Sequence, residues 1–168
     1  MSSDLSSLGY VIEFSIGLAG FSGIITVLNA NSWGKLEHYR TLVLLLSALI
    51  PGFAAFSALI WHSFLEVESA WRASALSFVL MLLPLLLVIT FGRTRFGVRQ
   101  YPQFNKHRVN FATSILLLAA TLQIMVLVGV APDFHSTSFL AGLVGVLLVG
   151  AIQFFAALVH ARRDTNDA

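Results

Sequence analysis

Five long apolar stretches, separated by short polar segments, constrain this 168-residue chain more than any other feature. Each stretch has roughly 20 residues, the length that an α-helix needs to cross the hydrocarbon core of a bilayer. The stretches cover residues 8–29, 41–61, 73–92, 111–131 and 138–160. We therefore predict an all-α, polytopic integral membrane protein, in which residues 1–168 form a single domain, a bundle of five transmembrane helices.

Charged side chains are almost absent from these stretches. Charged residues make up 11% of the chain and hydrophobic residues 57%, whereas soluble domains average about 25% charged residues. Of the 10 Lys and Arg and the 8 Asp and Glu residues, only Glu13 lies inside a predicted span. A charge at the middle of a membrane costs at least about 2.5–3.5 kcal/mol. This distribution excludes a soluble enzyme, a nucleic-acid-binding domain and a disordered regulator.

The basic residues predict how the bundle is oriented. Cytoplasmic loops of membrane proteins carry an excess of Lys and Arg. If the N-terminus faces outward, the outer segments hold only Arg72. The inner segments then hold Lys35, Arg40, Arg93, Arg95, Arg99, Lys106, Arg108, Arg162 and Arg163. We predict an N-out/C-in, multi-pass protein of the cell (plasma or inner) membrane.

The first predicted span differs from the others in its small and polar residues. Helical spacing places Glu13, Gly17, Gly20 and Gly23 along one broad face. Small residues on such a face allow another helix to approach closely. We include the hydroxyl residues Ser22 and Thr26 in the same candidate site. The opposite side is expected to be bulky and to hold Ile12, Ile16, Phe21, Ile25 and Leu28.

The carboxylate of Glu13 is the candidate functional group, since an ionisable residue inside a membrane usually has a role. Spacing along the predicted span places it about 9 Å outward from the middle. Three interpretations are open. A ring of such carboxylates in a homo-oligomer would filter ions by charge, and a single shielded carboxyl group could carry protons. Alternatively, the side chain is hydrated by the outer headgroups or bonded to a neighbouring helix.

Two classes of function follow from these interpretations. The first is a small homo-oligomeric channel or permease that conducts cations or protons. In it, Glu13 forms an outer charge filter above a path lined by Gly17, Gly20, Ser22, Gly23 and Thr26. The second class is a non-transporting assembly, sensor or partner subunit, in which the small-residue face of the first span docks another helix.

Catalysis and cofactor binding have no support in the sequence. The chain has no cysteine, which excludes disulfides, thiolate metal sites and thiol catalysis. Its five histidines lie at the ends of the predicted spans, and no two are four residues apart as in a helical metal pair. Hydrolase and phosphate-binding motifs are also absent. We predict that the protein is not an enzyme and has no metal site, cofactor or nucleic-acid partner.

The segment between the third and fourth spans is the most basic part of the chain. Its cations could bind anionic lipid headgroups, at about 1 kcal/mol for each cation near the surface. They could also bind a cytoplasmic partner or only fix the orientation of the bundle. The candidate headgroup-binding residues are Arg93, Arg95, Arg99, Lys106 and Arg108. Within the fourth span, Gln123 is expected to hydrogen-bond to a neighbouring helix.

Overall fold

The computed structural model of the chain is all-helical and describes residues 2–28, 34–95, 106–130 and 132–164. Its elements are α1 (Ser2–Leu28), α2 (Lys35–Phe64), α3 (Val67–Arg95), α4 (Lys106–Val128), the short 3-10 helix η3 (Pro132–Phe134) and α5 (His135–Asp164). Within the described residues, the five α-helices are each long and apolar enough to cross a bilayer. The predicted fold class is confirmed to this extent.

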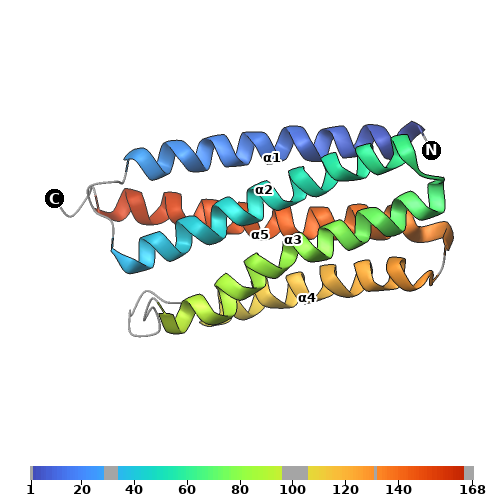
Figure 1. The fold of residues 1–168 in the computed structure, drawn as a ribbon. Coiled ribbons are helices and arrows are strands. Elements are labelled where there is room, and N and C mark those ends of the chain that lie inside the picture. Colours follow the sequence, from blue (N-terminus) through green and yellow to red (C-terminus); the bar gives the residue numbers. More distant parts are fainter. Residues whose placement is uncertain (1, 29–33, 96–105, 131, 165–168) are drawn as a thin grey trace.

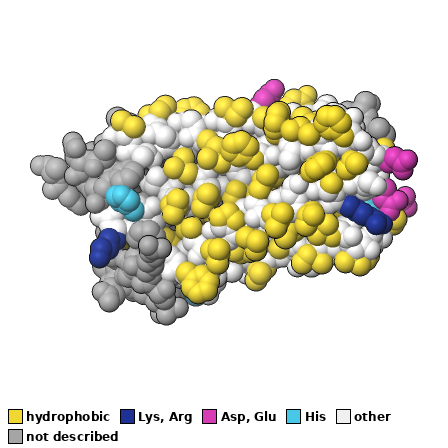
Figure 2. Space-filling view, in the orientation of Figure 1, with side chains coloured by type: hydrophobic (Ala, Val, Ile, Leu, Met, Phe, Trp, Pro, Cys, Tyr) yellow, Lys and Arg dark blue, Asp and Glu magenta, His cyan; other side chains and the backbone are white. Residues whose placement is uncertain are grey.

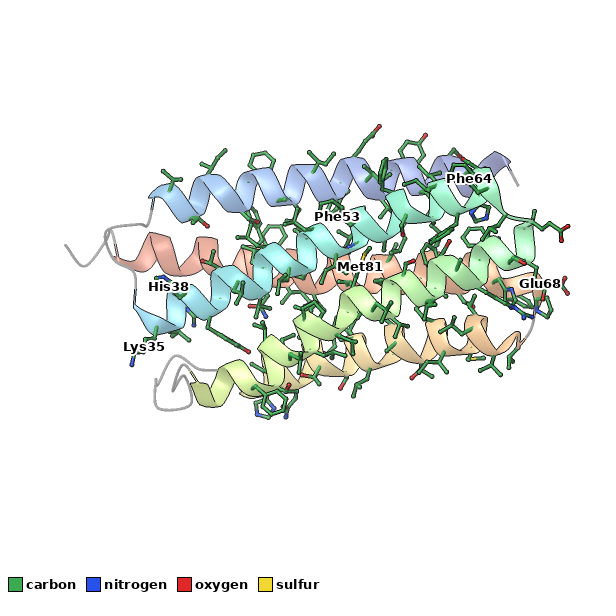
Figure 3. The ribbon with its side chains drawn as sticks, in the orientation of Figure 1. Lys35, His38, Phe53, Phe64, Glu68 and Met81 are labelled. Carbon is green, nitrogen blue, oxygen red and sulfur yellow. The ribbon has the colours of Figure 1, made fainter. Side chains whose placement is uncertain are left out.

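The helices lie side by side and alternate in direction along the chain (Figure 1). Helix α1 packs against α2 and α5, while α3 packs against α2 and α4. Helix α5 also contacts α2 and α4, so that it joins the two sides of the bundle. We use "N-terminal end" for the end of the bundle at which α1, α3 and α5 begin. The opposite, C-terminal end holds Lys35 and His38, whereas Glu68 lies at the N-terminal end (Figure 3).

Helices α1, α3 and α4 contribute narrow seams of buried side chains at alternating spacings of three and four residues, whereas α2 and α5, which contact more neighbours, bury broader faces. In α3 this seam consists of Ala75, Phe78, Leu82, Leu85 and Ile89. In α1 it consists of Leu8, Val11, Ser15, Leu18 and Ser22. Such spacing keeps one stripe of a helix turned toward its neighbours. The surface outside the seams is also apolar along the sides of the bundle (Figure 2), as a lipid-facing surface requires.

Glycines of α2 and α5 allow the helices to approach closely inside the bundle. A Cβ atom built on Gly52 of α2 would lie 2.8 Å from the Cβ atom of Ser15 in α1. One built on Gly150 of α5 would lie 3.0 Å from a methyl carbon of Leu18 and 3.1 Å from the hydroxyl oxygen of Ser47. Because none of these positions has room for an added side chain, small residues determine the helix spacing here.

The connection from α4 to α5 begins with a glycine cap. Gly129 has a φ of 78°, a conformation that residues with a side chain rarely adopt. Its N–H donates to the carbonyl of Val126 at 3.1 Å, and the N–H of Val130 donates to the carbonyl of Met125 at 3.0 Å. These two bonds form the Schellman motif that ends many helices.

Replacing Gly129 by alanine is expected to lower the free energy of unfolding by about 1–2 kcal/mol, the cost of the left-handed conformation for a residue with a Cβ atom. Thermal unfolding of the purified protein in mild detergent measures the change. Gly17→Ala is the matched control, because a Cβ atom there has nothing within 4 Å. Equal loss of stability in both variants would contradict the proposed cap.

Candidate functional site

Glu13 lies on the side of α1 that faces away from the bundle. At about 100° per residue, its position is opposite the middle of the buried seam of α1, and its side chain is exposed. Gly17 and Gly20 are exposed on the same side. We call these three residues the outward face of α1. Figure 2 shows acidic side chains at the N-terminal end of the bundle and also within the apolar flank over α1.

The register between α1 and α2 places this carboxylate deep along the bundle. Ser15 is level with Gly52, which lies twelve residues before the end of α2 at Phe64. At a rise of about 1.5 Å per residue, Glu13 is about 15 Å from Phe64, where α2 ends at the N-terminal end of the bundle. It is also only about 5 Å from the middle of the apolar window His38–Phe64 of α2. Glu13 is therefore closer to the middle of the apolar length of the bundle than spacing along the first span alone indicates.

Among the residues that the structure describes, the Glu13 carboxylate has no hydrogen-bond or ion-pair partner. Another acidic residue, Glu68, does have a partner: its carboxylate pairs with Arg72 at 2.5 Å, one turn further along α3 at the N-terminal end of the bundle. A carboxylate that faces hydrocarbon without a partner loses the hydration that it has in water. The outward face of α1 thus carries a carboxylate that no described residue of the bundle pairs with.

The glycines of the outward face have no packing function within the bundle. A Cβ atom built on Gly17, Gly20 or Gly23 has nothing within 4 Å, in contrast to Gly52 and Gly150. Large apolar side chains surround the glycines, and each is more than half exposed. Phe14 and Phe21 lie on one side and Ile16 on the other, while Ile24 lies in line with the glycines, one turn beyond Gly20. The result is a strip of exposed backbone between bulky walls, a shape that accepts the side chains of another helix.

The structure separates the residues that the sequence grouped together in α1. Glu13, Gly17 and Gly20 point outward, and Gly23 lies at the edge of this face. Ser22 is fully buried in the seam, and its hydroxyl donates to the carbonyl of Leu18 at 2.6 Å. The partly buried hydroxyl of Thr26 donates to the carbonyl of Ser22 at 2.8 Å.

The expectation that Ile16 and Phe21 lie opposite Glu13 is wrong. Both side chains are exposed and flank the outward face, while the side opposite Glu13 is the buried seam. The physical reason is that lipid-facing and core-facing residues are both apolar, so hydropathy does not distinguish them.

Two apolar grooves border α1 along its sides. One, of about 570 Å³, lies between α1 and α5 and is lined by residues such as Tyr10, Phe14 and Leu147. The other, of about 290 Å³, lies between α1 and α2, and Phe53 of α2 projects beside it (Figure 3). These grooves lie on either side of the exposed face of α1 that carries Glu13.

The candidate headgroup-binding residues cannot be placed in the same way. Arg99 and the side chains of the other four lie outside the part of the chain that the structure describes: Arg93, Arg95, Lys106 and Arg108. Lipid binding by these cations stays a prediction.

Buried polar groups near the N-terminal end are a feature that sequence reasoning missed. His135 is only 3% exposed, although it lies between two predicted spans. His62 packs edge-on against Trp71 with ring centroids 4.4 Å apart, and its Nδ1 lies 2.8 Å from the carbonyl oxygen of Ala58. Among the described residues, no three His, Asp or Glu side chains are grouped to hold a metal ion.

The expected bond from Gln123 to a neighbouring helix is confirmed. Its Nε2 donates to the carbonyl of Ser138 in α5 at 3.3 Å, and the side chain is fully buried. Its Oε1 has no partner among the described residues. The interaction links α4 to α5 and has no connection with the outward face of α1.

Comparisons of the chain with protein-family models, with curated proteins and with solved structures found no match.

Proposed function

We propose that this protein spans the cell membrane N-out/C-in and is a non-enzymatic subunit that binds another membrane protein through the outward face of α1. The observation that carries the proposal is the contrast between two sets of glycines. Those of α2 and α5 are packed against neighbouring helices, whereas Gly17 and Gly20 are open and lie beside an unpartnered carboxylate. The fold itself gives no reason for this combination of residues.

Docking of a second helix on this face would give the Glu13 carboxylate a partner and would fill the space beside the open glycines. A charge near the middle of a bilayer costs at least about 2.5–3.5 kcal/mol when lipid surrounds it, and a hydrogen-bond donor from a partner offsets that cost. The open glycines would allow close backbone approach, which drives helix association in membranes through van der Waals contact. Polar and packing interactions would thus act at the same place.

A homo-oligomeric channel or permease for cations or protons is the second candidate, with Glu13 facing a shared axis as a charge filter. The observation that bears on it is the apolar composition of the bundle interior, which determines where an ion path could run. The buried described residues are apolar except for Ser15, Ser22, Ser47, Ser74, Gln123 and His135. An ion path would therefore run between copies, where Glu13 points. Against this candidate, water along that path would wet Phe14, Ile16, Phe21 and Ile24, which a dry interface would bury.

Gly20→Leu is expected to reduce association with the partner at least ten-fold while leaving the fold intact, since a leucine side chain fills the strip that the partner helix would occupy. The measurement is the native mass of the tagged protein extracted from its own membranes in mild detergent. Ala141→Leu is the matched control, because Ala141 is a small exposed residue on α5. The same native mass for both variants, equal to that of the wild type, would contradict docking through α1.

The channel candidate has its own test in liposomes that contain the purified protein. It predicts cation flux in the wild type and a clear reduction in Glu13→Gln, because the amide cannot attract cations. Equal flux in both proteins, or none in either, would exclude it.

A further inference from the structure

We propose that the helix bound by α1 belongs to a different membrane protein and carries a lysine or arginine level with Glu13. This inference rests on the proposed function and names the partner's chemistry. It follows from the charge of Glu13, from its depth, and from what a second copy of this chain could offer at that depth.

The position of Glu13 requires a complementary group from outside the bundle. The carboxylate points away from every other helix of the fold and has no partner among the described residues. An interface that covers it with apolar side chains alone would bury a carboxyl group without a hydrogen-bond or ion-pair partner, which costs free energy, whereas a cationic side chain would pair with it. Acidic and basic residues within membranes pair with one another for this reason. The matching side chain is therefore cationic.

A second copy of the chain does not supply such a group. All ten Lys and Arg residues lie outside the predicted spans. The exposed hydroxyls of Thr90, Ser114 and Thr121 donate to carbonyls one turn earlier in their own helices. A second α1 would bring another Glu13, of the same charge, and Tyr10, a neutral phenol that is 70% exposed. The cation must come from another protein.

The spacing along α1 also specifies where the partner's cation lies. Gly17 and Gly20 are about 6 Å and about 10 Å further toward the C-terminal end than Glu13, at about 1.5 Å per residue. The closest backbone approach is therefore expected one to two turns from the charge pair. A partner helix that fits this face has its lysine or arginine about four residues from a small residue.

The test uses synthetic transmembrane peptides and the full-length protein in phosphatidylcholine vesicles. The first peptide contains leucine and alanine, a central lysine and a glycine four residues to each side of it, so that either orientation presents the same pattern. A second peptide has leucine in place of the lysine, and a third has glutamate. Because the chain has no cysteine, the variant Ser69→Cys at an exposed position of α3 accepts a single dye for energy transfer to a labelled peptide.

We expect the lysine peptide to bind the wild-type protein at least ten-fold more tightly than the leucine peptide, and the glutamate peptide to bind most weakly. In Glu13→Gln this preference for lysine should disappear, while binding of the leucine peptide is unchanged. Glu13→Asp is the conservative variant and should retain most of the preference, because it keeps the charge.

Three results would overturn the inference. They are equal binding of the lysine and leucine peptides, no binding of the lysine peptide, and Glu13-dependent self-association that displaces the lysine peptide. The native mass of Gly20→Leu reports on docking independently of charge. If that variant loses its partner while the peptides show no preference for lysine, docking stands and the cationic partner is wrong. If its mass is unchanged, the proposed function itself fails.

Discussion

Replacing Gly52 by alanine is expected to lower the free energy of unfolding by about 1–3 kcal/mol, the usual penalty for adding a methyl group to a tightly packed contact. The added Cβ atom would lie 2.8 Å from the Cβ atom of Ser15. Both atoms are attached directly to backbone, so no side-chain rotation relieves the overlap, and α1 must move away from α2. The transition measured by helical circular dichroism against the mole fraction of sodium dodecyl sulfate reports the loss.

Two further variants separate this contact from a general effect of the substitution. Gly20→Ala adds the same methyl group to α1 where nothing lies within 4 Å, and it should not destabilise the fold. Ser15→Gly combined with Gly52→Ala removes the overlapping atom and should restore most of the lost stability, as expected for residues in direct contact. A fully stable Gly52→Ala variant, or a double variant with no recovery, would contradict the α1–α2 register on which the depth of Glu13 depends.

Glu13→Leu is expected to favour insertion of α1 into the membrane by about 3 kcal/mol, which corresponds to more than a hundred-fold change in the insertion equilibrium. The carboxylate near the middle of a span opposes insertion, whereas leucine on a lipid-facing surface promotes it. The same substitution should abolish association with the partner. Better insertion together with lost binding would indicate that Glu13 contributes to the interface with the partner and not to the stability of the fold.

The measurement compares the full chain with the Glu13→Leu and Glu13→Gln variants in a translation system that contains microsomes, with an engineered glycosylation acceptor ahead of α1. Glu13→Gln should lie between the wild type and Glu13→Leu, because the neutral amide is still polar. Insertion that is complete and equal in all three proteins would show that Glu13 is hydrated in the isolated chain, and would contradict its proposed depth.

The number and approximate positions of the helices could be predicted from the sequence, because bilayer thickness sets a minimum length for an apolar helix. Glu13 could be singled out for a related reason, since it is the one charge within the predicted spans. Both inferences use the strong difference between charged and apolar residues. This difference can be recognised in the sequence without any knowledge of how the helices pack.

The buried side of each helix could not be predicted in the same way. Ile16 faces outward and Leu18 faces inward, yet both are large and aliphatic, so only the packed structure distinguishes them. Which glycines pack against neighbouring helices could not be predicted either. Gly20 and Gly150 both lie in small-residue stretches, but only Gly150 contacts neighbouring helices in the bundle. The burial of His135 could not be predicted either, because the sequence does not show that α5 begins at that residue.

The most direct test of docking through α1 is site-specific photo-crosslinking in the protein's own membranes. A photoreactive residue replaces the large exposed side chain of Ile16, Phe21 or Ile24 on α1, and of Leu80 of α3 and Leu118 of α4 as lipid-facing controls. Docking through α1 predicts a discrete protein adduct from the three α1 positions, lost when Gly20→Leu is added, and only lipid adducts from Leu80 and Leu118. Lipid adducts alone at all five positions, or protein adducts of equal yield around the whole bundle, would contradict it.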